Sequence, residues 1–267
     1  MTAVYNYPVK SCRATAVSAA GISPEGIDGD RQLMILRNGQ FTNQARIAKL
    51  ATVATQRIDA ECIEFDGGGV RLRHTIDPSG AESTIDFYGN AVAVVDQGDA
   101  LAELVSRAVG TEVRVAALKD RFRRAVPLEE FAIVDGIDQS RFVDVAPILV
   151  TNEDSLRDLN ARLDTPVPMN RFRPNVVVEG LGAFGEDDVV ALAGNGWKLM
   201  RATHCERCAV TCTDQETGER ASEPLATLKA YRHREGGYAG GVMFGAYMGV
   251  AGSGEVRVGD TVQVVRD

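Results

Sequence analysis

The chain has 267 residues, 45% of them hydrophobic, which is enough to build a sizeable core in one large domain or two smaller ones. Asp and Glu outnumber Lys and Arg by 37 to 29, and the formal charge of -8 argues against a general surface for nucleic acid or anionic membranes. No signal-peptide pattern and no run of about 18 apolar residues occurs. The five cysteines do not resemble a secreted disulfide framework, so we expect a cytoplasmic protein with reduced thiols.

The first part of the chain, residues 1–115, is predicted to consist of short strands divided by glycine and asparagine turns. Its clearest signal is Asn38-Gly39, which follows an apolar run and suits a type I′ hairpin because both residues tolerate positive φ. A helix is expected over residues 99–110, with Asp99 as its candidate N-cap and Gly110 as its end. Further strands are expected within residues 50–60, 62–74 and 83–96.

Residues 118–130 carry a basic cluster and a proline with little periodicity, which predicts a linker. We therefore expect two domains, 1–117 and 118–267. Strands dominate both parts, with a few helices, and repeated short strands are typical of barrel-like β domains. The expected fold is α+β and mainly β, with an N-terminal β-barrel-like domain packed on a second β domain.

Elements after the linker are predicted from capping and strand patterns. Residues 147–163 predict a strand that leads, through a capping turn near Thr151 and Asn152, into a helix. A strand is expected after Pro174, and two strands joined at a cysteine cluster are expected within residues 197–214. The alternation of valine with polar residues around Gly259-Asp260 predicts a terminal hairpin.

The cysteine cluster consists of Cys205, Cys208 and Cys212, and it allows several interpretations. A zinc site needs four converging ligands, and the usual second pair of ligands at matching spacing is missing. On a strand over residues 208–213, one metal cannot easily gather both Cys208 and Cys212. For Cys205 and Cys212 the sequence therefore favours small buried hydrophobic side chains.

Cys208 is distinguished by its neighbour Arg207, because a nearby guanidinium favours the thiolate form of a cysteine. A thiolate is a nucleophile or a ligand for a soft metal. Nucleophilic catalysis needs a base, and the sequence places none of its histidines convincingly for that role. A single thiolate suffices for a metal that is held mainly by an organic cofactor.

Such a cofactor also needs polar and cationic side chains, and several lie beside probable strand ends. The candidates are Lys10, Ser11, Arg31, Arg171, Arg173 and Asn175. Single arginines near strands are usually surface charges, so the sequence alone leaves open whether these residues converge.

Several motifs occur in a fixed order from about Tyr7 to Val264. They are YPVKSC, DGDRQLMIL, NRFRPNVVVEG, CERCAVTCTDQETGER, MFGAYM and VRVGDTVQVV. Together they resemble the MOSC family, the molybdenum-cofactor sulfurase C-terminal domain preceded by its N-terminal β-barrel domain. Within that family the chain looks most similar to the mitochondrial amidoxime reducing component and its bacterial relatives. The resemblance implies that both domains are β-barrels.

The resemblance implies a molybdopterin-type molybdenum cofactor bound between the two domains, with Cys208 as the metal ligand at the catalytic centre. Family positions that hold the pterin and its phosphate fall on Lys10, Ser11, Arg31, Arg173, Asn175, Glu206 and Arg207. A further lining segment falls on Asp144, Val145 and Ala146, and another lining residue on Tyr247. Glu206 replaces a small hydroxyl residue, so we expect only its backbone to bind. Asp214 is expected to form a turn.

The implied activity is that of an oxidoreductase that removes oxygen from small N-hydroxylated compounds, namely amidoximes, hydroxylamines and N-hydroxylated bases. The sequence carries no iron-sulfur cysteine motif. Electrons are therefore expected from a separate ferredoxin, cytochrome b5-like protein or flavoprotein reductase. A basic surface at Arg121, Arg123 and Arg124 is a candidate docking site for it.

Two other functions stay open at this point. A carrier would store, deliver or sulfurate the cofactor without turnover, although the sequence shows no pyridoxal-phosphate-dependent desulfurase domain that would supply sulfur. A zinc-stabilised β protein would contain stoichiometric zinc and no molybdenum. Reduction of benzamidoxime with an artificial electron donor separates the reductase from the carrier.

Overall fold

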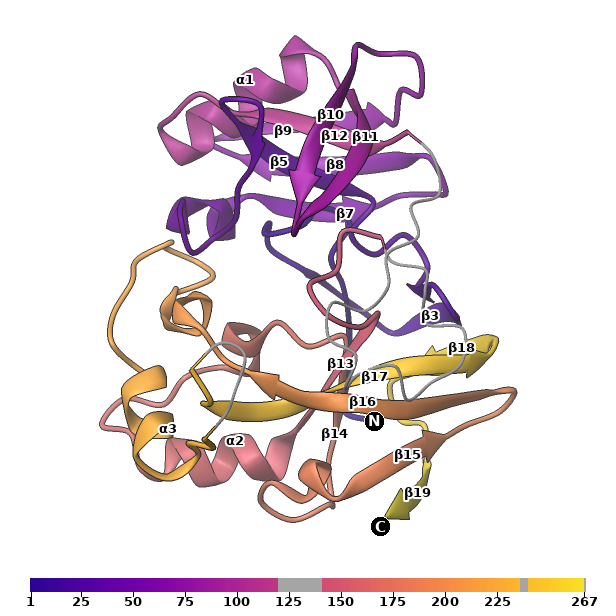
Figure 1. Cartoon of the computed structure of the whole chain (residues 1–267), viewed down its shortest axis with the longest axis vertical. Coiled ribbons are helices and arrows are strands. Elements are labelled where there is room, and N and C mark those ends of the chain that lie inside the picture. Colours follow the sequence, from indigo (N-terminus) through magenta and orange to yellow (C-terminus); the bar gives the residue numbers. More distant parts are fainter. Residues whose placement is uncertain (120–140, 236–239, 267) are drawn as a thin grey trace.

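The computed structural model describes residues 1–119, 141–235 and 240–266. Figure 1 shows two lobes, with most of the first 119 residues in the upper lobe and the later segments in the lower lobe. The first strands are β1 (Ala3–Asn6), β2 (Thr15–Val17), β3 (Ala19–Ser23), β4 (Gly26–Ile27), β5 (Leu33–Arg37), β6 (Gln40–Phe41), β7 (Ala54–Arg57), β8 (Cys62–Gly67), β9 (Val70–Thr75), β10 (Glu82–Phe87), β11 (Asn90–Asp96) and β12 (Arg114–Leu118).

The remaining strands are β13 (Ile148–Asn152), β14 (Val176–Val178), β15 (Val189–Ala193), β16 (Trp197–Glu206), β17 (Met243–Gly252), β18 (Gly254–Arg257) and β19 (Gln263–Arg266). The α-helices are α1 (Asp99–Val109), α2 (Glu153–Asn160) and α3 (Leu225–Tyr231). Short 3-10 helices are η1 (Ala48–Thr52), η3 (Met169–Phe172), η4 (Gly185–Asp187) and η5 (Ala209–Cys212).

The first lobe combines a five-stranded sheet, in the order β10-β11-β12-β5-β6, with a three-stranded sheet of β7, β8 and β9. Helix α1 contacts β12, β8 and β9 through buried side chains that include Leu101 and Leu104. Burial of each such leucine stabilises the lobe by roughly 2 kcal/mol. Gly110 ends the helix in the left-handed conformation, as predicted. The N-cap is Gly98 and not Asp99, which is instead the first helical residue and interacts favourably with the helix dipole there.

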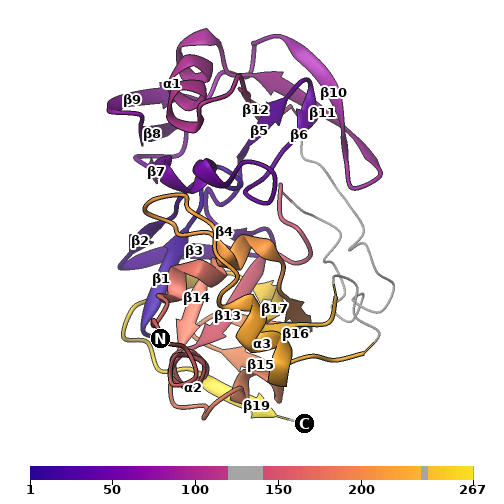
Figure 2. The same cartoon turned by 90° about the vertical axis from the view of Figure 1, so that its left-hand side faces the viewer.

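The second lobe is built on an eight-stranded sheet in the order β19-β15-β16-β17-β13-β14-β1-β2. Figure 2 shows α2 and α3 in front of this sheet. The first strand of the chain belongs to it, because Ala3 pairs with Val177 of β14. The following segment crosses to the first lobe, where Val9 forms a parallel bridge with Leu33 of β5. This crossing places the YPVKSC motif between the lobes.

Local turn signals placed several elements correctly. Asn38 and Gly39 have φ values of 51° and 69° and join β5 to β6, so the predicted hairpin is confirmed. The side chain of Asn152 caps α2 by accepting a hydrogen bond from the backbone N–H of Asp154 at 3.1 Å, which confirms the capping turn. The dominance of strands, with three α-helices in the described part of the chain, confirms an α+β fold that is mainly β.

Two predicted pairs of strands are wrong. The chain leaves β16 at Glu206 and enters the short helix η5, in which both the N–H and the hydroxyl of Thr211 donate to Cys208 O. At the C-terminus, β18 pairs with β3 while β19 pairs with β15, so these strands do not form a hairpin. The two strands belong to different sheets, and a local alternation pattern cannot reveal which sheet a strand joins.

The predicted linker over residues 118–130 and the docking surface at Arg121, Arg123 and Arg124 fall almost wholly outside the described residues. The domain division after residue 117 stays a prediction. Within the described ranges, no helix is long and apolar enough to cross a membrane.

Candidate functional site

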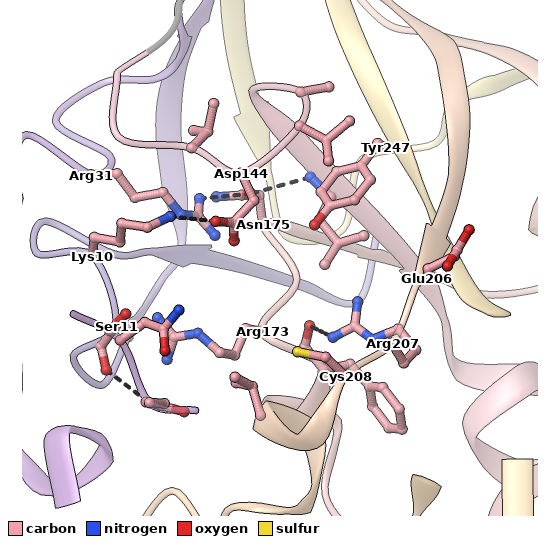
Figure 3. Close-up of a pocket in the computed structure, with 18 of the residues that line it drawn as sticks. Lys10, Ser11, Arg31, Asp144, Arg173, Asn175, Glu206, Arg207, Cys208 and Tyr247 are labelled. Atoms are coloured by element: carbon pink, nitrogen blue, oxygen red, sulfur yellow. Dashed lines mark hydrogen bonds and ion pairs between the residues drawn. The ribbon is translucent and has the colours of Figure 1, made fainter. Parts of the chain in front are cut away.

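A cavity of about 420 Å³ lies between the two lobes. Figure 3 shows Lys10, Ser11 and Arg31 on one side and Glu206 and Arg207 on the other. The cavity is lined by every residue that the family resemblance implied: Lys10, Ser11, Arg31, Asp144, Val145, Ala146, Arg173, Asn175, Glu206, Arg207, Cys208 and Tyr247. Arg171, the other candidate, does not line it, because its guanidinium pairs with Asp214 at 2.8 Å.

Lys10 is buried in the cavity wall, where its ammonium is held by several groups. It donates to Phe142 O at 2.9 Å and to Asp144 Oδ1 at 2.6 Å, and two phenylalanine rings lie 5.4 Å from Nζ. Tyr88, at the tip of the β10-β11 hairpin, donates its hydroxyl to the same Asp144 oxygen at 2.7 Å. Although burial opposes ionisation, the Lys10 charge and the Tyr88 hydroxyl hold the pKa of the Asp144 carboxyl well below its usual range. Asp144 is therefore a fixed anion on this wall.

Arg31 is balanced by a carboxylate. Its Nη1 forms an ion pair with Asp30 and donates to Asn175 Oδ1 at 3.2 Å. Burial opposes the charge, but the Asp30 carboxylate raises the pKa of Arg31. Asn175 also accepts a hydrogen bond from Leu149 N at 3.2 Å, so its amide is fixed between the two lobes.

Arg173 lies in the same wall without such a balance. Its Nη1 donates to Cys12 O at 2.8 Å and to Gln215 Oε1 at 3.2 Å. In the described part of the chain, no carboxylate forms an ion pair with it. Burial lowers the pKa of Arg173, as expected for a cation that has left water without a counter-charge.

Arg207 contacts Cys205 and not Cys208, which corrects the sequence interpretation. Its Nη1 donates to Cys205 Sγ at 2.7 Å and its Nη2 to Phe172 O at 2.6 Å. Residues two apart in an extended segment share a face, whereas direct neighbours point to opposite faces. Burial raises the pKa of the Cys205 thiol, and the Arg207 charge offsets this only in part. Cys205 and Cys212 are buried, as predicted, and Cys208 is exposed.

Ser11, Arg31 and Arg173 share a backbone conformation that side chains other than glycine rarely adopt. Their φ values are 72°, 50° and 55°. A residue other than glycine in this left-handed region raises the free energy of the fold by about 1 kcal/mol or more. Such strain is found where the surrounding structure holds the residue in that geometry. All three side chains line the cavity, so the strain coincides with the site.

The donor set of the cavity fits an anionic ligand that also carries a soft metal. Arg173 and Arg207 are guanidinium groups without a carboxylate partner among the described residues, and Arg207 Nε is buried without any hydrogen-bond partner. An unpaired buried charge is costly, so an anion bound here would recover that cost. The exposed thiol of Cys208 offers a soft ligand in the same cavity. No three His, Cys, Asp or Glu side chains of the described ranges group to hold a metal ion.

Sequence reasoning missed several lining residues, among them Tyr88 and Gln44. The sequence predicted strands within residues 83–96, but a strand pattern carries no information about what the turn at Tyr88 contacts. Gln44 exchanges amide hydrogen bonds with Gln215, at 3.1 Å in both directions, across the two lobes. Asp214 accepts hydrogen bonds from the backbone N–H groups of Glu216 and Thr217, which confirms it as a turn-former.

Two family models match the chain. The MOSC domain matches residues 138–263, and the MOSC N-terminal beta barrel domain matches residues 1–112. Between them these ranges contain every predicted site residue.

Comparison with characterised proteins gives the same family. Mitochondrial amidoxime reducing component 2 of Bos taurus is 30% identical, over 96% of this chain and 80% of its own length. Mitochondrial amidoxime-reducing component 1 of Homo sapiens is 28% identical over 97% of this chain and 81% of its own length. Molybdenum cofactor sulfurase of Oryza sativa subsp. japonica is 28% identical over 97% of this chain and 34% of its own length. The chain therefore belongs to the family of MOSC-domain proteins that carry an N-terminal MOSC β-barrel domain.

Proposed function

We propose that the chain is a molybdenum-cofactor-dependent oxidoreductase that reduces small N-hydroxylated compounds, namely amidoximes, hydroxylamines and N-hydroxylated bases. The observation that carries the proposal is one cavity in which the exposed thiol of Cys208 shares the lining with the buried Arg207 and the half-buried Arg173, neither of which has a carboxylate partner among the described residues. The names of its relatives refer to amidoxime reduction and to the molybdenum cofactor, which supports this choice of reaction.

In this proposal the chain's own residues bind and orient the cofactor. Cys208 ligates the metal and does not attack the substrate. Arg173 and Arg207 offset the negative charge of the cofactor, and Asn175 offers its amide to the pterin edges. Lys10 keeps Asp144 ionised, so this wall also presents an acceptor to N–H groups of a ligand. When bound, the cofactor supplies two-electron oxygen-atom-transfer chemistry.

The proposal includes a separate electron-transfer protein, of the ferredoxin, cytochrome b5-like or flavoprotein class, and a cytoplasmic location. The candidate docking residues for this partner lie outside the described part of the chain. The alternative function is a carrier that binds the cofactor without turnover, and the likeness to a molybdenum cofactor sulfurase keeps it as an outcome of the test.

The test is expression in a host that makes the cofactor, followed by metal analysis and a benzamidoxime assay with an artificial electron donor. We expect stoichiometric molybdenum and formation of benzamidine. Cys208→Ala should lose the metal and at least 100-fold of the activity, whereas Cys62→Ala, a half-buried thiol on β8, should retain both. A Cys208→Ala variant with full molybdenum and full activity contradicts the proposal. Bound molybdenum without turnover supports the carrier, and stoichiometric zinc without molybdenum contradicts both.

A further inference from the structure

We propose that Tyr7 is a positioning residue that holds two cavity arginines, Arg31 and Arg173, against its single buried ring, where they bind a phosphate group together. The inference rests on the proposed function only in that the cofactor is the expected source of this phosphate. The site itself requires a phosphate or pyrophosphate anion and no metal.

The ring of Tyr7 lies directly against both guanidinium groups. The Cζ atom of Arg31 is 4.7 Å from the ring centroid and that of Arg173 is 4.5 Å from it. Tyr7 itself is 1% exposed, so the two cations have little access to water on the side of the ring. A cation over an aromatic face is attracted by the quadrupole of the ring, and the attraction grows when water is excluded.

Hydrogen bonds join Tyr7 to Arg31 and to residues next to the two arginines. Its hydroxyl donates to Pro174 O at 3.0 Å, next to Arg173. Its N–H donates to Asp30 Oδ1 at 2.8 Å, and its carbonyl accepts from Arg31 N at 2.6 Å. Each arginine is thus anchored to Tyr7 both through the ring and through an adjacent residue.

The arrangement opposes the natural tendency of two like charges to separate. Arg31 has one carboxylate partner, Asp30, whereas Arg173 has none among the described residues. Both residues also adopt left-handed backbone conformations, which direct their long side chains into the cavity at a cost. Two guanidinium groups with a single carboxylate between them carry a surplus positive charge. A phosphate group, which accepts bidentate hydrogen bonds from arginine, neutralises that surplus.

The position of Arg31 and Arg173 in the cavity suits the phosphate end of a bound ligand. Figure 3 shows Arg31 across the cavity from Arg207 and Glu206, and both Arg31 and Arg173 line the same cavity as Cys208. A ligand that reaches from Cys208 to this pair would therefore present a soft-metal end and an anionic end to opposite sides. Tyr7 does not line the cavity, so its effect must pass through the arginines.

The test measures binding of inorganic pyrophosphate by calorimetry to the full chain, produced in a host that cannot make the cofactor. Tyr7→Phe keeps the ring and should bind within about twofold of the natural protein. Tyr7→Leu removes the ring and should bind roughly tenfold more weakly, because two cation-ring contacts are lost. The matched control is Tyr231→Leu at the end of α3, which removes the ring whose centroid lies 4.4 Å from Arg162 Cζ and should leave the affinity unchanged.

An unchanged affinity in Tyr7→Leu overturns the proposal, as does a Tyr7→Phe variant that is as weak as Tyr7→Leu. If Tyr7→Leu does not fold, nuclear magnetic resonance of the natural protein decides. Side-chain protons of Arg31 and Arg173 should then resonate upfield through the ring current and shift together as pyrophosphate is added, with one shared Kd. Absence of the upfield shift, or two different Kd values, overturns the proposal. A protein that binds pyrophosphate in this way but never contains molybdenum contradicts the proposed function alone.

Discussion

Two groups of arginine side chains in the described part of the chain meet different hydrogen-bond acceptors. In the Asp187 cluster, formed by Asp187, Arg201, Arg232, Arg234 and His204, the groups converge on one residue. Arg232 and Arg234 bind Asp187 Oδ2 at 2.5 and 3.2 Å, and Arg201 and His204 contact Asp187 O. In the cavity, the hydrogen-bond acceptors that Arg173 and Arg207 find among the described residues are carbonyl groups, an amide and a thiol.

The difference separates charge that stabilises the fold from charge that is available to a ligand. A buried cation beside a carboxylate has recovered most of its lost hydration, and removal of its partner destabilises the protein. A buried cation among neutral acceptors keeps a net field that attracts an anion. The Asp187 cluster is thus expected to determine stability, and the cavity arginines are expected to determine ligand affinity.

The largest expected effect comes from removal of the carboxylate in the Asp187 cluster. Asp187→Ala leaves the partly buried Arg232 without its ion pair, so the free energy of unfolding should fall by about 3 kcal/mol. Urea unfolding measures this change. Pyrophosphate affinity at temperatures where the variant is folded should stay within twofold of the natural protein. A loss below about 1 kcal/mol would show that the cluster is not the stabilising one.

Arg173→Gln tests whether the cavity arginines determine ligand affinity. Loss of a charged donor should weaken pyrophosphate binding by about 30-fold, which corresponds to roughly 2 kcal/mol for charge-assisted hydrogen bonds. Without ligand, the free energy of unfolding should stay unchanged or rise, because the variant no longer holds a half-buried charge without a carboxylate partner. Calorimetry and urea unfolding measure the two quantities. If the variant is destabilised by more than about 2 kcal/mol while its affinity is unchanged, Arg173 stabilises the fold and does not bind the ligand.

Glu186, next to Asp187 in sequence, shows the cost of an unbalanced buried carboxyl. It is fully buried, accepts from Ser155 Oγ at 2.6 Å and leaves Oε1 without a partner. Burial raises the pKa of Glu186 from 4.5 to about 6. Between these values the folded state binds more protons than the unfolded state, so stability should fall by about 2 kcal/mol as pH rises through the window.

The measurement is urea unfolding between pH 4 and 7, with Glu186→Gln as the matched variant. The glutamine retains an oxygen for Ser155 and cannot ionise, so its unfolding free energy should lack the fall assigned to Glu186. If the natural protein and the variant have parallel pH profiles, Glu186 does not titrate in this range.

The sequence was informative wherever a local pattern or a motif determines the outcome. Asn38-Gly39 and Asn152 act through their own backbone, and their elements were found where expected. The motif residues were recognised because the family pattern already encodes their convergence. The partner of Arg207 was misjudged because the interpretation considered the adjacent cysteine and not the one on the same face. The role of Tyr7 depends on Arg31 and Arg173, which contact its ring but are distant from it in sequence, and no periodicity reveals such contacts.

The smallest expected effect comes from giving a carboxylate partner to an arginine that lacks one. Gln215 Oε1 lies 3.2 Å from Arg173 Nη1, so Gln215→Glu gives this arginine the carboxylate that it lacks. The new ion pair competes with a bound anion, and pyrophosphate affinity should fall about fivefold. The free energy of unfolding should change by less than about 1 kcal/mol. The new ion pair stabilises the fold, but the variant loses the amide donors to Gln44 Oε1 and Thr213 O.

Thr217→Glu is the matched control for this conversion. It adds the same charge to an exposed position of the same turn, away from Arg173, and so separates the local ion pair from a general change in charge. Calorimetry should show weaker binding for Gln215→Glu and little change for Thr217→Glu. Equal losses in the two variants would mean that net charge alone controls anion binding. The distinction between balanced and unbalanced arginines would then have no consequence for ligand affinity.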